Sequence, residues 1–237
     1  MLLETLETKF NASEKGEPVA LVLRKHDLKR MRALLDAEPE LLGKGDKRSN
    51  QPIHWATMTR QLDAIDELLR RGADINARRM DGARPIHLTN GDYFYRGWRD
   101  VPRLWRVTPG NVMAHLKAKG AVIDLPTACH TGDIERVREL LRQDPALANR
   151  VSEHEGYYLG AGAPLANAAA AGRMDIGQLL LHQGPDPNLP ADLPRIALAH
   201  ATIQGFGSAQ DDDDDSAPAA NWIDLAALPA ESIDYIA

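Results

Sequence analysis

The sequence predicts an all-α fold, a solenoid of stacked helix-turn-helix units with short hairpin fingers, and two observations predict it. Proline recurs at near-constant intervals: Pro18, Pro52 and Pro85 are 34 and 33 residues apart, and Pro164 reopens the pattern later. Two of these prolines stand in nearly identical segments, QPIHWA at 51–56 and RPIHLT at 84–89. Such a period is typical of small helical units that cannot bury their apolar faces alone and therefore stack.

The second unit, residues 51–83, shows the pattern most clearly. Pro52 suits the first turn of a helix, and we expect a short helix that ends at residues 60–61. A second helix is predicted by an apolar stripe at helical spacing, formed by Leu62, Ile65, Leu68 and Leu69. Gly72 follows it, where a left-handed cap favours a residue without Cβ. The polar stretch after it contains the tight-turn pair Asp81–Gly82 and predicts a hairpin finger.

The same template divides most of the chain. We expect a cap segment at 1–16 and a repeat array at 17–205, with units at 17–50, 51–83, 84–122, 123–162 and 163–193 and a half-unit at 194–205. Residues that begin helices or hold turns are expected to be structural, and these are Pro52, His54, Gly72, Pro85, His87, Gly120, Gly132, Pro164, Gly172 and Gly184. Unit 84–122 carries a long insertion between its helices, and Asp124 takes the proline position in the next unit.

These segments resemble the ankyrin repeat family, whose unit opens Thr-Pro-Leu-His-x-Ala and closes Gly-Ala-Asp-x-Asn. The resemblance covers residues 17–190 and is degenerate, because Gln51, Arg84 and Ala163 replace the opening threonine. The imperfect repeats and the single cysteine favour a bacterial source. The resemblance implies stacked helix pairs whose fingers project to one side, with partner proteins bound along the concave face and the fingertips.

Composition favours a cytoplasmic protein without a membrane span. The sequence does not determine the oligomeric state, and we expect a monomer. No run of about 18 apolar residues occurs, and the first residues are acidic where a secretory signal needs basic ones. Cys129 is the only cysteine, so no intrachain disulfide can form. The net charge of −6 is uneven, since five consecutive aspartates stand at 211–215. They predict a disordered acidic tail at 206–237 that ends in a short apolar segment.

Basic residues of the first two fingers are the first candidate contact surface. Lys44, Lys47 and Arg48 precede the second unit, and Arg78, Arg79 and Arg84 follow it, so neighbouring fingers predict one basic edge. Such an edge is usually a solvated face; otherwise it suits an acidic partner. The chain's own run Asp211–Asp215 could fold back over this edge by direct contact. Nucleic acid would bind only nonspecifically, because no groove-reading element is present.

Two aromatic segments are further candidates. The insertion at 90–105 contains Tyr93, Tyr95 and Trp98, which form either a local core or a contact surface. The long finger at 150–160 contains Tyr157 and Tyr158, which we expect to contact a partner. His154 lies there between two glutamates; no second ligand is placed by spacing, and we expect it to be solvated.

No catalytic, phosphate-binding or metal-binding motif occurs in the sequence. His54 and His87 match the histidine of the resembled family, whose ring hydrogen-bonds neighbouring turns. We therefore expect a non-catalytic protein–protein recognition scaffold without cofactor or metal. The alternatives are a site for a small ligand or carbohydrate at the insertion, with or without catalysis, and a spacer that presents the acidic tail. The expected contact residues are Lys47, Arg48, Trp55, Arg78, Arg79, Met80, Asp81, Tyr93, Tyr95, Trp98, Tyr157 and Tyr158.

Overall fold

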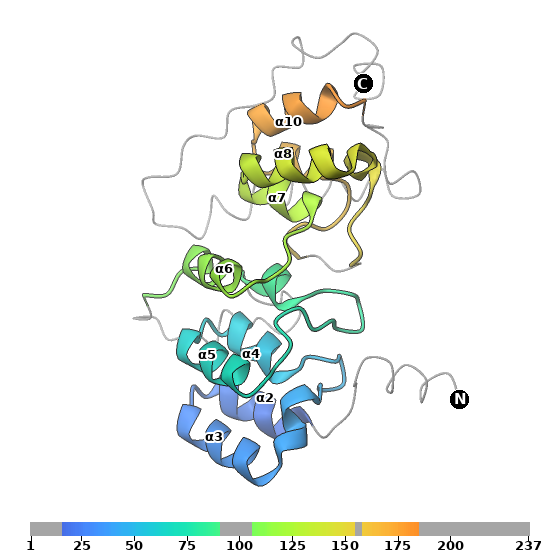
Figure 1. Ribbon diagram of the computed structural model, residues 1–237. Coiled ribbons are helices and arrows are strands. Elements are labelled where there is room, and N and C mark those ends of the chain that lie inside the picture. Colours follow the sequence, from blue (N-terminus) through green and yellow to red (C-terminus); the bar gives the residue numbers. More distant parts are fainter. Residues whose placement is uncertain (1–15, 91–105, 155–157, 185–237) are drawn as a thin grey trace, which may run out of the picture. The chain divides into compact units, whose positions relative to one another are not determined.

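The computed structural model describes residues 16–90, 106–154 and 158–184 (Figure 1). Over these residues the protein contains nine α-helices, three 3₁₀ helices and no strand. The all-α prediction is thus confirmed. The expected half-unit at 194–205, the acidic tail and nearly all of the expected cap segment lie outside the described residues.

Helix pairs follow one another along the chain. The first two pairs are α2 (Glu17–Arg24) with α3 (Leu28–Ala37) and α4 (Pro52–Met58) with α5 (Leu62–Arg70). The third is the 3₁₀ helix η3 (Pro85–Leu88) with α6 (Pro109–Ala118), and the last two are α7 (Leu125–Thr131) with α8 (Ile134–Gln143) and α9 (Pro164–Ala170) with α10 (Met174–Leu181). Short 3₁₀ helices follow α3 and α8, namely η2 (Pro39–Gly43) and η5 (Pro145–Asn149).

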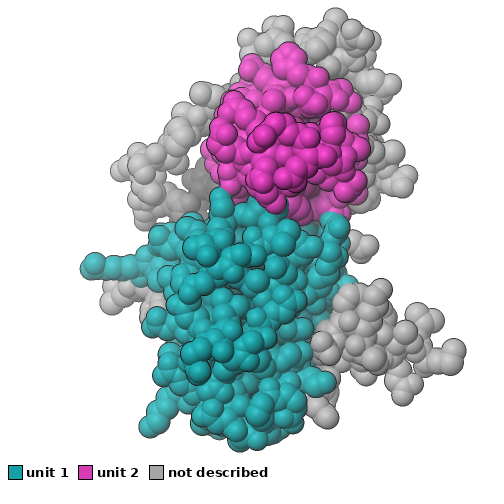
Figure 2. All heavy atoms as spheres, in the orientation of Figure 1, with its two compact units in different colours: residues 1–123, 153–159 teal, residues 124–152, 160–237 magenta. Residues whose placement is uncertain are grey.

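The chain divides into two compact units, which Figure 2 colours separately. Unit 1 comprises residues 1–123 and 153–159, and unit 2 comprises residues 124–152 and 160–237. The polypeptide therefore passes from one unit to the other at three places in the sequence. Residues 153–159 belong to the unit formed mainly by the first half of the chain, although both their neighbours belong to the other.

Prolines and capping side chains begin these helices. A proline occupies the first turn of α2, α4, η3 and α9, where a missing backbone N–H costs little. Helices α6 and α7 also have a proline in the first turn, and in both a polar side chain caps the helix as well. Asp124 at the start of α7 accepts from the Thr127 N–H at 3.0 Å, and Thr108 at the start of α6 accepts from the Asn111 N–H at 3.1 Å.

A residue with positive φ separates the two helices of four pairs. These residues are His26 (56°), Arg60 (56°), Gly132 (77°) and Gly172 (62°). The left-handed conformation ends the first helix and lets the second begin within two residues. A side chain there costs roughly 1–2 kcal/mol, so the first two pairs carry strain that glycine removes in the later ones.

The short helix α4 lies at the centre of unit 1. It contacts α2 on one side, η3 on the other and α5 behind, and every residue from Pro52 to Met58 is buried. The apolar stripe of α5 faces it, with Ile65 and Leu68 fully buried. Because α4 is enclosed by its neighbours, its side chains serve the interior of the stack.

Ion pairs connect the second helices of unit 1. Arg71, the residue that follows α5, binds Asp36 of α3 and Glu67 of α5, both at 2.7 Å. On the same helix, Asp66 lies 2.9 Å from His115 and 2.8 Å from Lys119, at the end of α6. Hydrogen bonds from Arg70 and Arg71 lower the pKa of Glu67 to about 2. These contacts join α3, α5 and α6 side by side.

Unit 2 has its own core between its two helix pairs. The buried side chains that form it are Ala128, Cys129, Val137, Leu141, Ala168, Ile176 and Leu180. Burial raises the pKa of the Cys129 thiol to about 12, so this cysteine is a packed apolar residue rather than a nucleophile.

Replacing Leu68 by Ala tests how unit 1 is held together. Leu68 is 0% exposed, and deleting a fully buried leucine side chain costs about 2–5 kcal/mol of unfolding free energy. The matched control is Leu21→Ala on α2, since Leu21 is 51% exposed and should lose less than about 0.5 kcal/mol. Urea denaturation followed by circular dichroism measures both. Equal losses for the two variants would contradict the packing described here.

Candidate functional site: the fingers of unit 1

The first finger, residues 44–50, is folded around one buried carboxylate. Asp46 accepts hydrogen bonds from the backbone N–H groups of Arg48 and Asn50, at 2.9 and 3.0 Å. Its other oxygen accepts from the indole N–H of Trp55 at 3.0 Å. Because Trp55 belongs to α4, the indole anchors this finger to the centre of unit 1. The side chain of Lys47 remains exposed at the turn.

The second finger, residues 74–84, is anchored by the adjacent residue of the same helix. His54 accepts from the Gln51 N–H at 3.1 Å through Nδ1, and its Nε2 lies 3.0 Å from the carbonyl of Ala77. The acceptor at Nδ1 places the imidazole proton on Nε2, which donates to that carbonyl. Burial, with the nearby charge of Arg79, lowers the pKa of His54 to about 3. The imidazole is therefore a neutral structural link.

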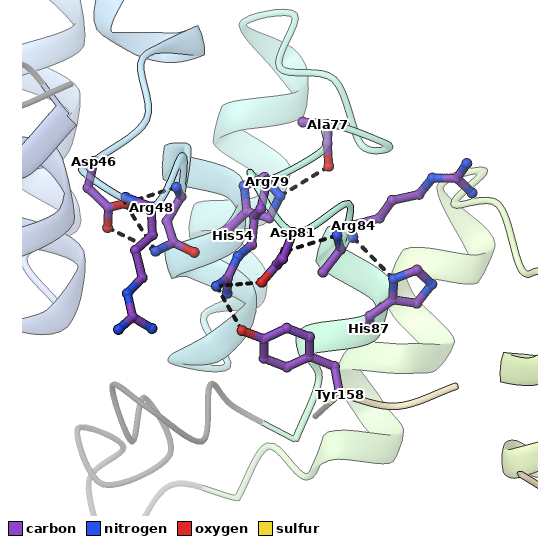
Figure 3. Close-up of polar contacts among 11 residues, drawn as sticks. Asp46, Arg48, His54, Ala77, Arg79, Asp81, Arg84, His87 and Tyr158 are labelled. Atoms are coloured by element: carbon purple, nitrogen blue, oxygen red, sulfur yellow. Dashed lines mark hydrogen bonds and ion pairs between the residues drawn. The ribbon is translucent and has the colours of Figure 1, made fainter. Parts of the chain in front are cut away.

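The tip of the second finger encloses a charged side chain. Arg79 is 1% exposed, and its guanidinium donates to the Tyr158 hydroxyl at 2.8 Å (Figure 3). The same group lies 3.1 Å from the Asp81 carboxylate and 4.9 Å from the centroid of the Tyr158 ring. Asp81 also caps the turn by accepting from the Ala83 N–H at 3.1 Å. A buried arginine is tolerated because a carboxylate, a hydroxyl and an aromatic face meet it.

Tyr158 belongs to a stretch, residues 153–159, that is part of unit 1 although it comes much later in the sequence. We call its described residues the docked segment: Glu153, His154, Tyr158 and Leu159. The Glu153 carboxylate forms ion pairs with Arg78 and with Arg84, and it lies 3.3 Å from the Arg84 guanidinium. Its backbone carbonyl lies so close to Gly82 that a Cβ there would overlap it.

The ring of His154 packs against His87 at 4.3 Å between centroids. Burial and the neighbouring His154 ring hold the pKa of His87 well below 6.5. The His87 ring is therefore neutral at this interior site, where it packs against His154.

The docked segment lies where the third helix pair offers no finger of its own. Only six residues, 119–124, separate α6 from α7, too few for a hairpin like the second finger. Within that connection the Val122 N–H donates to the side chain of Asn76 at 2.8 Å. The side of the second finger that a third finger would cover is instead covered by the docked segment, which comes much later in the sequence.

Comparison with known proteins agrees with this architecture. Residues 50–79 match the family model for the ankyrin repeat, and they span α4, α5 and the second finger up to Arg79. This match supports assignment to the ankyrin repeat family. Ankyrin repeats are generally protein–protein interaction modules and typically non-catalytic. A search of curated proteins found no match.

Two general features of this ankyrin repeat chain bear on its chemistry. Among the helices that the structure describes, none is long and apolar enough to cross a membrane. Within residues 16–90, 106–154 and 158–184, no three histidine, cysteine or acidic side chains gather in a way that could hold a metal ion.

The structure separates the expected contact residues by exposure. Lys47, Arg78 and Met80 are exposed, and Arg48 and Asp81 are partly buried. Trp55, Arg79 and Tyr158 are buried. In this conformation these three side chains therefore cannot contact a partner directly, contrary to expectation. Each has a polar group that is satisfied inside the protein and an apolar body that gains from burial.

The expected basic edge is also corrected. It was to combine Lys44, Lys47, Arg48, Arg78, Arg79 and Arg84, but Arg79 is internal and Glu153 binds Arg78 and Arg84. Like charges on adjacent turns repel, and the carboxylate of the docked segment relieves this repulsion. His154, expected to be solvated, is 3% exposed because it packs on His87.

Several predicted residues have other outcomes. Tyr93, Tyr95, Trp98, Tyr157 and the run Asp211–Asp215 lie outside the described residues. The prolines expected to be structural begin α4, η3 and α9, and the five glycines, Gly72, Gly120, Gly132, Gly172 and Gly184, all have positive φ.

Sequence reasoning missed Asp46 and Glu153 altogether. Asp46 had one signal, since aspartate often folds a turn by accepting backbone N–H bonds two residues ahead. For Glu153 no local signal existed, because its partners lie 69 and 75 residues away.

Replacing Trp55 by Phe removes one donor from buried Asp46 and keeps most of the ring. An unsatisfied buried polar group costs about 1–3 kcal/mol, and we expect that loss in urea denaturation. Trypsin should also cleave faster beside Lys47 and Arg48, because the first finger loses its anchor. In the background Asp46→Ala the same tryptophan substitution should cost much less, and equal costs in both backgrounds would contradict the anchor.

Acidification should destabilise the protein through His54. The folded pKa lies below the unfolded value of 6.5, so this contribution is fully present above pH 6.5 and is lost as the pH falls toward about 3. At pH 5 the unfolded chain binds a proton that the folded chain does not, which costs about 2 kcal/mol relative to pH 7.5. His54→Gln should reduce the pH difference in urea-unfolding free energy by that amount, with His182→Gln as the matched control. An undiminished difference in His54→Gln would show that another group is responsible.

Proposed function

We propose that this ankyrin repeat chain is a non-catalytic scaffold that recognises an acidic protein partner through the outer sides of its first two fingers. The contact surface consists of Lys47, Arg48, Arg78 and Met80. The observation that carries the proposal is that both fingers are anchored to adjacent residues of α4, while these four side chains remain at least partly exposed.

Rigid anchoring favours binding because less order must be gained when a partner arrives. Asp46 fixes the backbone of the first finger, and the bond between Arg79 N–H and the Ala83 carbonyl, 2.9 Å, fixes the second. Ordering a mobile loop and its side chains lowers affinity, so a preformed finger is a better contact surface than a free one.

The side chains on this surface suit a partner with acidic and apolar groups. Met80 is 40% exposed at the fingertip, and a flexible thioether adapts to varied apolar surfaces. Lys47, Arg48 and the two arginines that share Glu153 leave an excess of positive charge. Attraction between charges is screened beyond about 8 Å at physiological salt, so acidic groups of the partner must make direct contact.

The chain's own acidic run at 211–215 belongs to the same chemical class as this partner. We propose that this run competes with the partner for contact with Lys47 and Arg48. The alternatives of a ligand site in the aromatic insertion and of a spacer for the tail concern residues outside the described part of the chain.

Site-specific photocrosslinking tests the surface. A benzoylphenylalanine at position 80 of the full chain should form a discrete adduct in an extract of the source cells, and Lys47→Glu should weaken this adduct several-fold. The matched position is Val122, which is 43% exposed in unit 1 and lies outside the residues of the two fingers, and the matched charge variant is Lys29→Glu on α3. Equal adducts at positions 80 and 122, or equal effects of the two charge reversals, would contradict the proposal.

A further inference from the structure

We propose that the docked segment is an internal ligand of the second finger. In this view Glu153 and Tyr158 occupy a site that also accepts a peptide of another protein, one that presents an acidic residue and, after a short spacer, a tyrosine. The inference rests on the proposed function, because it assigns to the same fingers the chemistry of the partner and the means by which access to them is regulated.

The first argument is the match between the segment and the finger. Glu153 meets two arginines, Arg78 and Arg84, and the hydroxyl and ring of Tyr158 meet a third, Arg79. Charge-assisted bonds to arginine and aromatic contacts are the interactions that dominate protein interfaces. The docked segment therefore uses the finger as a bound peptide would.

The second argument is that docking is separable from the fold of unit 2. The Ser152 N–H donates to the Gly162 carbonyl at 2.9 Å, and the Gly162 N–H donates to the Ser152 hydroxyl at 2.9 Å. Gly160 packs directly on Thr127 of α7. These contacts close the base of the loop within unit 2, so the pairs α7–α8 and α9–α10 do not need the docked segment in place.

The third argument is that the two residues of the docked segment that contact arginines are buried to different extents. Glu153 keeps 60% of its side chain exposed, and exposed ion pairs contribute little to stability because water competes for both charges. Tyr158, by contrast, is buried against Arg79. A competing acid can thus enter at Arg78 and Arg84, after which a competing tyrosine can take the place of Tyr158.

A ligand on the same chain competes at a high local concentration. Tethering through a short loop gives an effective concentration on the order of millimolar, so free peptide must overcome the docked segment. Weakening the segment without altering the finger should therefore raise the affinity for peptide added in solution.

The experiment uses the full chain and a fluorescein-labelled peptide with the sequence of residues 151–161, measured by fluorescence anisotropy. The double variant Glu153→Gln with Tyr158→Ala should bind this peptide at least tenfold more tightly than the original chain. In that variant Arg78→Ala should weaken binding several-fold. Arg138→Ala should not; its side chain in unit 2 is 50% exposed, against 44% for Arg78. A peptide carrying the same two substitutions should not bind.

Equal affinity of the original chain and the double variant would overturn the proposal, and so would binding that Arg78→Ala leaves unchanged. Circular dichroism and gel filtration check that the double variant is folded. If it is not, Glu153→Gln alone, at an exposed position, should still raise the affinity two- to threefold, whereas Glu135→Gln should leave it unchanged.

The outcomes also separate this inference from the proposed function. Peptide binding to the double variant without an adduct at position 80 would retain the internal ligand and reject the surface at Met80. An adduct at position 80, with no gain in peptide affinity, would retain that surface and reject the internal ligand.

Discussion

Two hydrogen bonds from adjacent residues of α4 determine how the fingers of unit 1 are presented. Trp55 holds the first finger through Asp46, and His54 holds the second through the carbonyl of Ala77. Both bonds are buried, where a lost partner is costly, so the fingers cannot shift without disturbing the centre of the stack. The exposed side chains at the tips owe their fixed positions to this helix, whose own residues are all buried.

The charged side chains of the fingers differ in how deeply they are buried. The buried Arg79 is balanced by Asp81 and Tyr158, whereas Arg78 and Arg84 share the exposed Glu153. One arginine is thus buried between groups that neutralise its charge, whereas the other two form ion pairs near solvent, where such pairs exchange readily. The same finger thus combines a rigid interior with a surface on which one acid can replace another.

The sequence predicted the helix pairs because each unit repeats local signals, such as proline in the first turn and glycine after the second helix. It also identified the finger that carries Arg78 and Met80. It could not predict that Arg79 and Tyr158 are buried together, since that contact joins residues 79 apart and no periodic pattern encodes it. For the same reason the sequence predicted that His154 is a solvated loop histidine. No repeated sequence pattern predicted the ion pairs of Glu153.

The return of residues 153–159 to unit 1 affects the order in which the protein folds. Contacts in repeat proteins are mostly between sequence neighbours, and such contacts form early. Arg79 must instead wait until Tyr158 has been synthesised, by which time α4 to α8 already exist as chain. During synthesis on the ribosome, the contact that buries this arginine therefore forms only after residues 80–158 have been added.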